Sequence, residues 1–95
     1  MSAYVVIDIH ITDRDAYEGY KGGAAETVAL YKGRNLARGG KVTILEGEPD
    51  PERVVILEFP TAEDALSWWN SPEYMPFKQM RHAAATCEML LVEGI

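Results

Sequence analysis

Apolar and polar positions form two clear patterns that define the centre of the predicted fold. Residues 54–59 are a nearly continuous run of aliphatic and aromatic side chains that only Glu58 interrupts. Such a run is typical of a central strand covered on both faces. Residues 4–11 alternate with a period of two, so one face of a predicted strand carries four aliphatic side chains. Those four are Val5, Ile7, Ile9 and Ile11. Both segments therefore predict central strands of a sheet.

A helical spacing of apolar side chains follows the N-terminal strand. Thr12 or Asp13 can cap this helix, and acidic residues follow in its first turn, where the helix dipole favours them. Apolar and aromatic side chains then recur three and four positions apart, which predicts one buried stripe. The stripe consists of Tyr17, Tyr20, Ala24, Val28 and Tyr31. Gly22 and Gly23 lie in its middle, and because glycine lowers helix stability we expect a kink or a break there.

A second helical region begins after the run at residues 54–59. A proline ends the strand because it cannot donate to a sheet ladder, and Thr61 can cap the helix that follows. Its predicted inward face consists of Ala62, Ala65, Leu66 and Trp69. Ser71 and Pro72 then favour the start of a further helix, which runs to about residue 84. Its predicted inward side chains are Phe77, Met80 and Ala84.

Two further strands complete the predicted fold. Residues 34–38 begin an extended segment, two glycines suggest a bend, and residues 42–46 continue the strand. Residues 47–51 are rich in turn formers, and residues 86–93 form the last strand. The order is β-α-β-β-α-β, which predicts an α+β, ferredoxin-like domain over residues 1–95. We expect a four-stranded antiparallel sheet with helices on one face, and with the first and third strands central and parallel to each other.

The second face of the predicted sheet is half aliphatic and half charged. It carries Tyr4, Val6, Asp8, His10, Val54, Ile56 and Glu58. Because a solvated face should alternate polar groups throughout, we expect a second copy of the chain to cover it in a two-fold homodimer. Alternation in the second strand adds Arg34, Leu36 and Arg38. Buried charges need partners, so we expect Arg38 to pair with Glu58. Such charges form either a structural network at the dimer centre or the anchor of a ligand pocket.

Composition excludes several classes of function. The net charge is −6 at pH 7 and no basic cluster interrupts it, so we expect no nucleic-acid partner and no membrane partner. The single cysteine, Cys87, cannot form an internal disulfide, and two isolated histidines give no ligand set, so we expect no metal and no cofactor. Polar residues interrupt the first apolar run and no cationic segment precedes it, which argues against a signal peptide or a membrane span. We therefore expect a soluble, cytoplasmic protein.

Several short motifs along the whole chain resemble one known family. They are Arg34-x-x-x-Arg38-Gly39-Gly40, Glu46-Gly47, Pro51-x-Arg53 with the strand through Glu58-Phe59-Pro60, Trp69-x-Ser71-Pro72-Glu73-Tyr74, Arg81, and Val92-Glu93-Gly94. Together they are similar to the domain-of-unknown-function family numbered 1330, which belongs to the dimeric α+β-barrel superfamily. The resemblance implies the same homodimer and implies no particular reaction.

The wider superfamily includes cofactor-independent monooxygenases, muconolactone-isomerase-like enzymes and haem-handling proteins, whose sites lie between the sheet and the helices. By this resemblance a cleft here would be lined by Tyr17, Tyr20, Trp69, Tyr74 and Arg81. The alternative is that these aromatic side chains simply belong to the core, as aromatic residues at helical spacing commonly do. His10, near the end of a predicted strand, is the one candidate for a general base.

Three functions remain open on the sequence alone. The first is the binding of a small, anionic, partly apolar molecule, because guanidinium forks beside aromatic rings suit a carboxylate. The ligand-binding residues expected for it are Arg38, Glu58, Tyr20, Trp69 and Tyr74. The second is a cofactor-independent monooxygenase or isomerase that moves a proton through His10 or a carboxylate. The third is an interaction module in which dimerisation is the main role.

Overall fold

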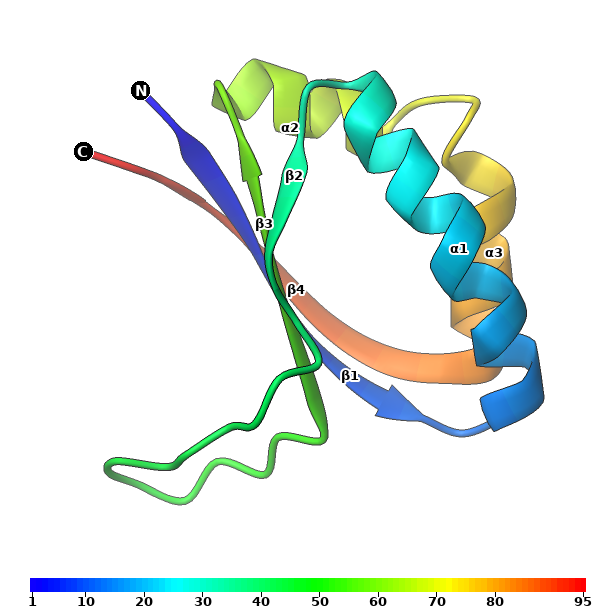
Figure 1. The fold of residues 1–95 in the computed structure, drawn as a ribbon, viewed down its shortest axis with the longest axis vertical. Helices are drawn as coiled ribbons and strands as arrows, with labels where there is room; N and C mark the ends of the chain where they lie inside the picture. The colour runs from blue at the N-terminus through cyan, green and yellow to red at the C-terminus, as the bar shows by residue number, and fades with distance from the viewer.

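Seven elements make up the fold of the computed structural model, which describes residues 1–95. In chain order they are β1 (Ala3–Ile11), α1 (Arg14–Leu30), β2 (Arg34–Arg38), β3 (Arg53–Phe59), α2 (Ala62–Trp69), α3 (Met75–Ala84) and β4 (Ala85–Glu93). The strands form one sheet in the order β2-β3-β1-β4, and the helices lie on one of its faces (Figure 1). The predicted ferredoxin-like α+β fold with a four-stranded antiparallel sheet is confirmed.

All neighbouring strands are antiparallel, including the two central strands β1 and β3. Val5 of β1, for example, lies opposite Leu57 of β3 and Leu91 of β4. The prediction that the two central strands run parallel is therefore wrong. The reason is connectivity: the crossover through α1 makes β2 run in the direction of β1, and the β2–β3 connection then reverses the chain.

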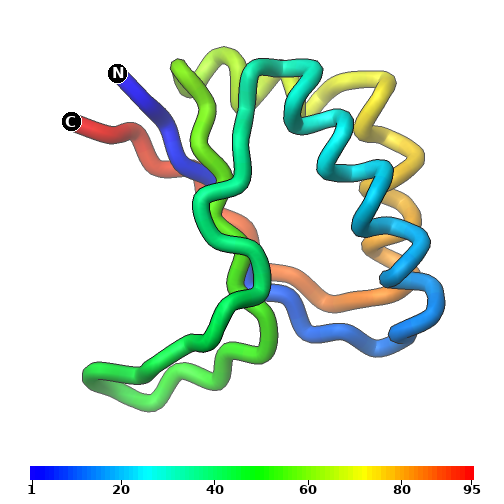
Figure 2. The backbone as a smooth tube through the Cα atoms, viewed as in Figure 1, coloured from blue at the N-terminus to red at the C-terminus, as the bar shows by residue number.

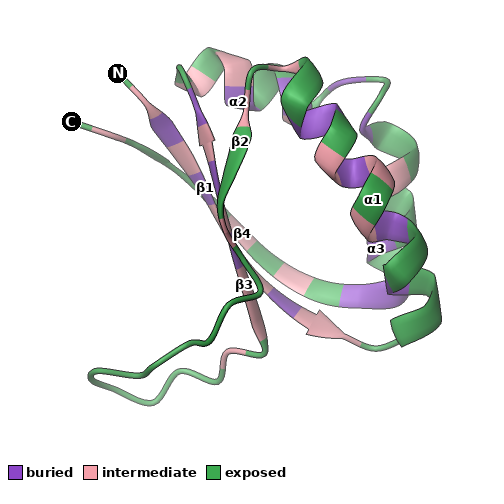
Figure 3. Ribbon diagram, in the orientation of Figure 1, coloured by how far each residue is buried: buried purple, intermediate pink, exposed green.

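The core lies between the sheet and the helices. Buried side chains alternate with half-buried ones along β1 and β3 (Figure 3). The predicted inward faces are confirmed for Val5, Ile7, Ile9, Val55, Leu57, Phe59, Tyr17, Tyr20, Ala24 and Val28, which are all buried. The opposite face of the sheet, which we call the bare face, carries the half-buried side chains of Tyr4, Val6, Asp8, His10, Val54, Ile56 and Glu58.

Helix α1 is continuous, so the kink or break expected at Gly22 and Gly23 is absent. Asp13 caps the helix by accepting an N–H bond of 3.1 Å from its first turn. Gly23 faces α3, where a Cβ would overlap the ring of Phe77, whereas a Cβ at Gly22 would meet no neighbouring atom. The glycine at position 23 thus permits the close approach of α1 and α3, and this packing outweighs the low helix propensity of glycine.

Helix α2 presents a different face to the core than predicted. Its buried side chains are Ala65 and Trp68, whereas Trp69 is half-buried and Leu66 is exposed. The Trp68 indole N–H donates to Thr27 Oγ1 at 3.1 Å, a bond that a buried indole requires. This contact fixes the rotation of α2 and turns Trp69 away from the centre of the core.

Helix α3 begins at Met75, later than predicted. Ser71 first closes a turn, because its Oγ accepts the N–H of Tyr74 at 3.0 Å. The core-facing side chain in the middle of α3 is Arg81, which is 3% exposed, and not the predicted Met80, which is 38% exposed. None of the three helices combines the length and the apolar composition that a membrane span requires.

Residues 39–52, which we call the arm, connect β2 and β3 without regular structure. The strand predicted at residues 42–46 is therefore absent. Gly39 N–H donates to the Val54 C=O at 3.0 Å at the base of the arm, whereas no backbone hydrogen bond joins residues 42–46 to the rest of the chain. Figures 1 and 2 show the arm projecting from the body on the side of the sheet opposite the helices. Its aliphatic side chains lie in solvent, with Val42 42%, Ile44 51% and Leu45 94% exposed.

Candidate functional site

A small cavity of about 40 Å³ lies between α1 and the sheet, and we call it the α1 cleft. Most of its lining is apolar core. The lining side chains that bear on recognition are Tyr17, Tyr20, Lys21, Arg38, Arg53 and Trp68. No aspartate or glutamate lines it, although the chain as a whole carries a net charge of −6. The cleft therefore gathers three cations in an otherwise acidic protein.

A bulge in β2 brings Arg38 to the α1 cleft. The register of β2 against β3 shifts by one residue between Asn35 and Ala37. Arg38 consequently lies opposite Val55, whose side chain faces the helices. Because one extra residue reverses the face of every side chain that follows, Arg38 does not share the bare face with Glu58 as simple alternation predicts.

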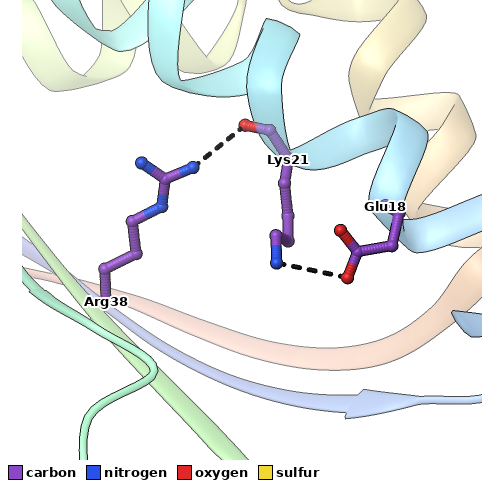
Figure 4. A network of polar contacts seen from close by, with 3 residues as sticks. All are labelled: Glu18, Lys21 and Arg38. Atoms are coloured by element: carbon purple, nitrogen blue, oxygen red, sulfur yellow. Dashed lines mark hydrogen bonds and ion pairs between the residues drawn. The ribbon is translucent and has the colours of Figure 1, made fainter.

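Arg38 spans the gap between β2 and α1 (Figure 4). Its Nη2 donates to the backbone C=O of Lys21 at 3.4 Å, which is long for a hydrogen bond. Lys21 in turn pairs with Glu18 at 3.2 Å between Nζ and Oε1. Arg38 forms no salt bridge. Its guanidinium therefore keeps free donors beside the cleft.

Glu58 lies on the bare face, and its partner is Arg34. Arg34 Nε and Nη2 lie 2.7 and 2.6 Å from Glu58 Oε1. The hydrogen bond from Arg34 holds the pKa of Glu58 below its usual value. The prediction that Arg38 pairs with Glu58 is therefore wrong. The bare-face charges form a structural pair there, separate from the α1 cleft.

Arg53 enters the cleft from the first position of β3. Its Nε is buried and has no hydrogen-bond partner, and its guanidinium carbon lies 5.7 Å from the ring centroid of Tyr17. Burial raises the pKa of Tyr17, and the charge of Arg53 opposes that shift. Gly39 has a φ of +70°, and a Cβ there would overlap the Arg53 guanidinium, so glycine lets the base of the arm pass over it. Arg53 also forms no salt bridge.

Three side chains behind the cleft form a buried chain of hydrogen bonds. The hydroxyl oxygens of Tyr20 and Tyr74 lie 3.0 Å apart, and Arg81 Nε donates to Tyr74 Oη at 3.3 Å. Burial raises the pKa of Tyr20 well above its usual value, so this phenol is protonated at neutral pH. The chain of bonds holds the Tyr20 ring in place as one wall of the cleft.

A second cavity, of about 270 Å³, lies between α2 and β4, and we call it the β4 groove. All of its lining side chains are apolar, among them Ala65, Leu66, Trp69, Met89, Leu90 and Leu91. At one end Lys78 Nζ lies 3.8 Å from the ring centroid of Trp69. Because no polar group in its lining would orient a small polar molecule, the groove suits aliphatic side chains.

The structure divides the predicted ligand-binding residues among four places. Arg38 and Tyr20 line the α1 cleft. Tyr74 lies behind Tyr20, and Trp69 lines the β4 groove. Glu58 lies on the bare face with Arg34 as its partner. Two of the five predicted residues therefore meet in one site.

Neither histidine lines the α1 cleft. His10, the predicted general base, lies on the bare face, where its Nε2 is 3.4 Å from Asp8 Oδ2. His82 is exposed on α3. Histidine, cysteine and carboxylate side chains come together nowhere in a group of three that could hold a metal ion. The cleft instead offers guanidinium and phenol donors, which can bind an anion and donate hydrogen bonds to it.

Four polar or aromatic lining residues are missed by the sequence-based prediction, namely Lys21, Asn35, Arg53 and Trp68. For Arg53 a signal exists, because it precedes Val55 by two positions and therefore faces the helices like the rest of that row. Lys21 lies beside the predicted stripe of α1. Its backbone carbonyl accepts the hydrogen bond from Arg38, and a backbone contact of this kind leaves no trace in the residue types of the sequence.

In fold, the chain is similar to several solved structures. RPA0582, a protein of unknown function from Rhodopseudomonas palustris, matches with a TM-score of 0.81 and 15% identity over 99% of this chain and 82% of that chain. SnoaB, a cofactor-independent oxygenase from Streptomyces nogalater, matches with a TM-score of 0.66 and 15% identity over 99% and 93%. A dimeric ferredoxin-like protein of unknown function from Bacteroides fragilis matches with a TM-score of 0.57 and 10% identity over 98% and 96%. At such identities the likeness establishes the fold alone.

In sequence, no curated protein matches the chain. The model of one family, DUF1330, described as a domain of unknown function, matches residues 2–95. This match spans nearly the whole chain and confirms the resemblance that the motifs predict. The chain therefore belongs to the DUF1330 family.

Proposed function

We propose that the protein is a homodimer that binds a small, anionic, partly apolar molecule in the α1 cleft, with Arg38 and Arg53 holding its charge. One observation carries the proposal. Two arginines without a carboxylate partner converge on a mostly apolar cleft, and Arg53 Nε is a buried donor with no acceptor. Guanidinium forks bind carboxylates through short, charge-assisted hydrogen bonds, and a buried donor such as Arg53 Nε is costly to leave without an acceptor.

The size of the cleft specifies how a ligand would bind. Its volume of about 40 Å³ exceeds the roughly 10–15 Å³ that one water needs, but lies far below the roughly 300 Å³ of a typical small-molecule pocket. The closed cleft thus accommodates a charged group. The apolar part of the ligand requires the cleft to open, and the weakest contact across it is the 3.4 Å bond from Arg38 to the Lys21 carbonyl.

The walls specify the apolar part. The rings of Tyr17 and Tyr20 pack together with centroids 5.4 Å apart, and Trp68 lines the cleft beside them. Aromatic walls favour a ring or a short aliphatic chain, because they bury apolar area and offer ring faces for stacking. We therefore expect a carboxylic acid with an aromatic or branched aliphatic body.

The homodimer rests on the bare face. Val6 lies opposite Ile56 on one side and Leu90 on the other, so an apolar stripe crosses three strands. Next to it, Tyr4 lies opposite Val92. Leu90 is 70% and Val92 51% exposed. Contiguous exposed apolar area marks an interface, and two-fold dimers are the commonest closed assemblies. The ferredoxin-like neighbour from Bacteroides fragilis is described as dimeric.

A cofactor-independent oxygenase or isomerase is the second candidate. It is favoured by the fold shared with SnoaB and by the hydrogen-bonded phenols of Tyr20 and Tyr74, because preorganised donors can stabilise a developing oxyanion. It has less support than binding, since neither histidine lines the cleft. An interaction module without a ligand has less support too, because its charges should satisfy one another, whereas Arg53 Nε has no partner.

A thermal-shift screen of aromatic and aliphatic carboxylates tests the binding proposal. At a hundredfold excess over its Kd, a ligand should stabilise the protein by about 2.7 kcal/mol. Arg38→Met should abolish the shift, whereas Arg34→Met, a matched change in the same strand on the bare face, should preserve it. The proposal fails if no acid raises the Tm of wild type, or if the Arg38→Met protein binds the hit as tightly.

Sedimentation equilibrium tests the homodimer independently of any ligand. Wild type should sediment as a dimer at micromolar concentration. Ile56→Asp should sediment as a monomer, because it places an unpaired charge within the apolar stripe. A wild-type protein that is monomeric under these conditions contradicts the dimer and leaves the binding proposal standing.

A further inference from the structure

The α1 cleft holds two positive charges that no acidic group balances. Lys21 also lines the cleft, but its ammonium group is paired with Glu18 at 3.2 Å. Arg38 and Arg53 form no salt bridge, and no aspartate or glutamate lines the cleft. Glu52, the acid next to Arg53 in the chain, accepts a backbone N–H of β1 at 2.8 Å. A ligand with a single carboxylate would therefore balance only one of the two arginines.

The two guanidinium groups come from neighbouring parts of the sheet and contact α1 at different points. Arg53 lies against the residue next to Arg38, because a Cβ at Gly39 would overlap its guanidinium. Its guanidinium carbon lies 5.7 Å from the centroid of the Tyr17 ring, whereas Arg38 donates to the Lys21 carbonyl. Tyr17 and Lys21 are four positions apart on one face of α1, which is a rise of about 6 Å. Two carboxylates joined by a short spacer of about two or three carbons fit this separation, because each C–C bond spans about 1.5 Å.

The contact between Arg38 and Lys21 is the one that a second carboxylate would replace (Figure 4). It is long, at 3.4 Å, and its acceptor is a neutral carbonyl. A carboxylate is a stronger acceptor, because it is charged and engages two N–H groups of one guanidinium at once. Arg38 is exposed and lies on an edge strand, so its side chain can turn without disturbing the core. Its movement would open the mouth of the cleft, as the apolar part of a ligand requires.

We infer that the ligand is a dicarboxylate. One carboxylate binds Arg53 inside the cleft, and the other draws Arg38 away from the Lys21 carbonyl and so admits the apolar body. This inference rests on the proposed binding function, whose ligand it specifies, and it is independent of the homodimer. It explains why a chain with a net charge of −6 keeps two unpaired arginines at one site. A monocarboxylate would leave one arginine without an anion and the cleft closed.

Phenylsuccinate and its two monomethyl esters test the inference, because the three probes share one aromatic body and differ in the number of carboxylates. In NMR titrations of wild type, the diacid should bind at least about tenfold more tightly than either ester, since each ester lacks one charge-assisted contact. The diacid should shift the Nε–H signals of both Arg38 and Arg53, whereas the esters should shift that of Arg53 alone. Arg38→Met should reduce the preference for the diacid to about twofold or less. Arg34→Met, the matched change in the same strand, should keep the full preference.

The outcomes separate this inference from the binding function on which it rests. Esters that bind as tightly as the diacid and shift the Arg53 signal overturn the dicarboxylate and leave the binding function standing. A preference for the diacid that survives in Arg38→Met, or that leaves the Arg38 signal in place, also overturns it, because the second carboxylate then binds elsewhere. If neither the three probes nor any acid of the thermal-shift screen binds, both the dicarboxylate and the binding function fall.

Discussion

Replacing Arg53 with methionine should leave the unliganded protein as stable as wild type, or make it more stable. Arg53 forms no salt bridge and its buried Nε has no acceptor. Removing an unsatisfied buried donor recovers about 1–3 kcal/mol, while the lost contact with the Tyr17 ring costs about 0.5–1 kcal/mol. Methionine keeps an unbranched apolar stem in the same space. The expected change in the free energy of unfolding is thus a gain of about 0–2.5 kcal/mol.

Urea denaturation in buffer free of carboxylates measures this change. Arg34→Met is the matched control, because Arg34 has a partner in Glu58, and it should lower the urea midpoint. The Arg53→Met protein should also fail to bind any carboxylate that stabilises wild type. A loss of more than about 1 kcal/mol in unliganded Arg53→Met would refute the reasoning, because removing a buried donor without an acceptor should not destabilise the protein. It would show that Arg53 is kept for the fold and not for a ligand.

Two further predictions concern packing and pH. Gly22→Ala should stabilise the protein by about 0.5–1 kcal/mol. Gly23→Ala, whose methyl group would overlap Phe77, should be at least about 1 kcal/mol less stable than Gly22→Ala by urea midpoint. Equal gains in the two variants would contradict the described packing of α1 on α3. The hydrogen bond from Arg34 lowers the pKa of Glu58 in the folded state, so the pair stabilises the protein at any pH above the pKa that Glu58 has in the unfolded chain. This stabilisation is lost as the pH falls through the pKa of Glu58 in the folded state. Stability should therefore fall less steeply between about pH 5 and pH 3 in Glu58→Gln than in wild type, and an unchanged slope would contradict the pair.

The central strands could be predicted because their signal is strong and local. Along β1 the aliphatic side chains Val5, Ile7 and Ile9 occupy every second position, and a slip of one residue would turn all of them toward the other face. The same alternation fails in β2, where one extra residue between Asn35 and Ala37 reverses the face of Arg38. Nothing in a single sequence marks this bulge, because it is stabilised by contacts with α1 and β3.

The buried face of a helix was predicted correctly where only one face is clearly apolar. It was missed where two neighbouring faces are similarly apolar. In α2 the adjacent Trp68 and Trp69 are both candidates for the core, and the hydrogen bond from Trp68 to Thr27 of another helix decides between them. In α1 the expected break at Gly23 does not occur, because the glycine serves packing against Phe77, a residue more than fifty positions away. Such contacts between distant elements carry no periodic signal.

The candidate site was predicted only in part, because contacts between distant elements decide which side chains meet in it. The notion of a cationic, aromatic cleft with Arg38 and Tyr20 follows from residue types, but which of the arginines and aromatic side chains meet depends on register and helix rotation. Arg53 was available from alternation with Val55. Its importance, however, lies in a buried Nε without an acceptor, a property that only the three-dimensional structure shows.

The most direct test of the central claim observes the guanidinium groups themselves during a carboxylate titration. NMR spectra of the Nε–H groups resolve arginines individually once they are assigned by substitution. The account predicts that the Arg53 signal shifts in a saturable manner and becomes protected from exchange with water, because Nε gains an acceptor. The Arg34 signal, already bonded to Glu58, should stay unchanged. A carboxylate that binds while the Arg53 signal stays in place, or that moves the Arg34 signal instead, would contradict the account.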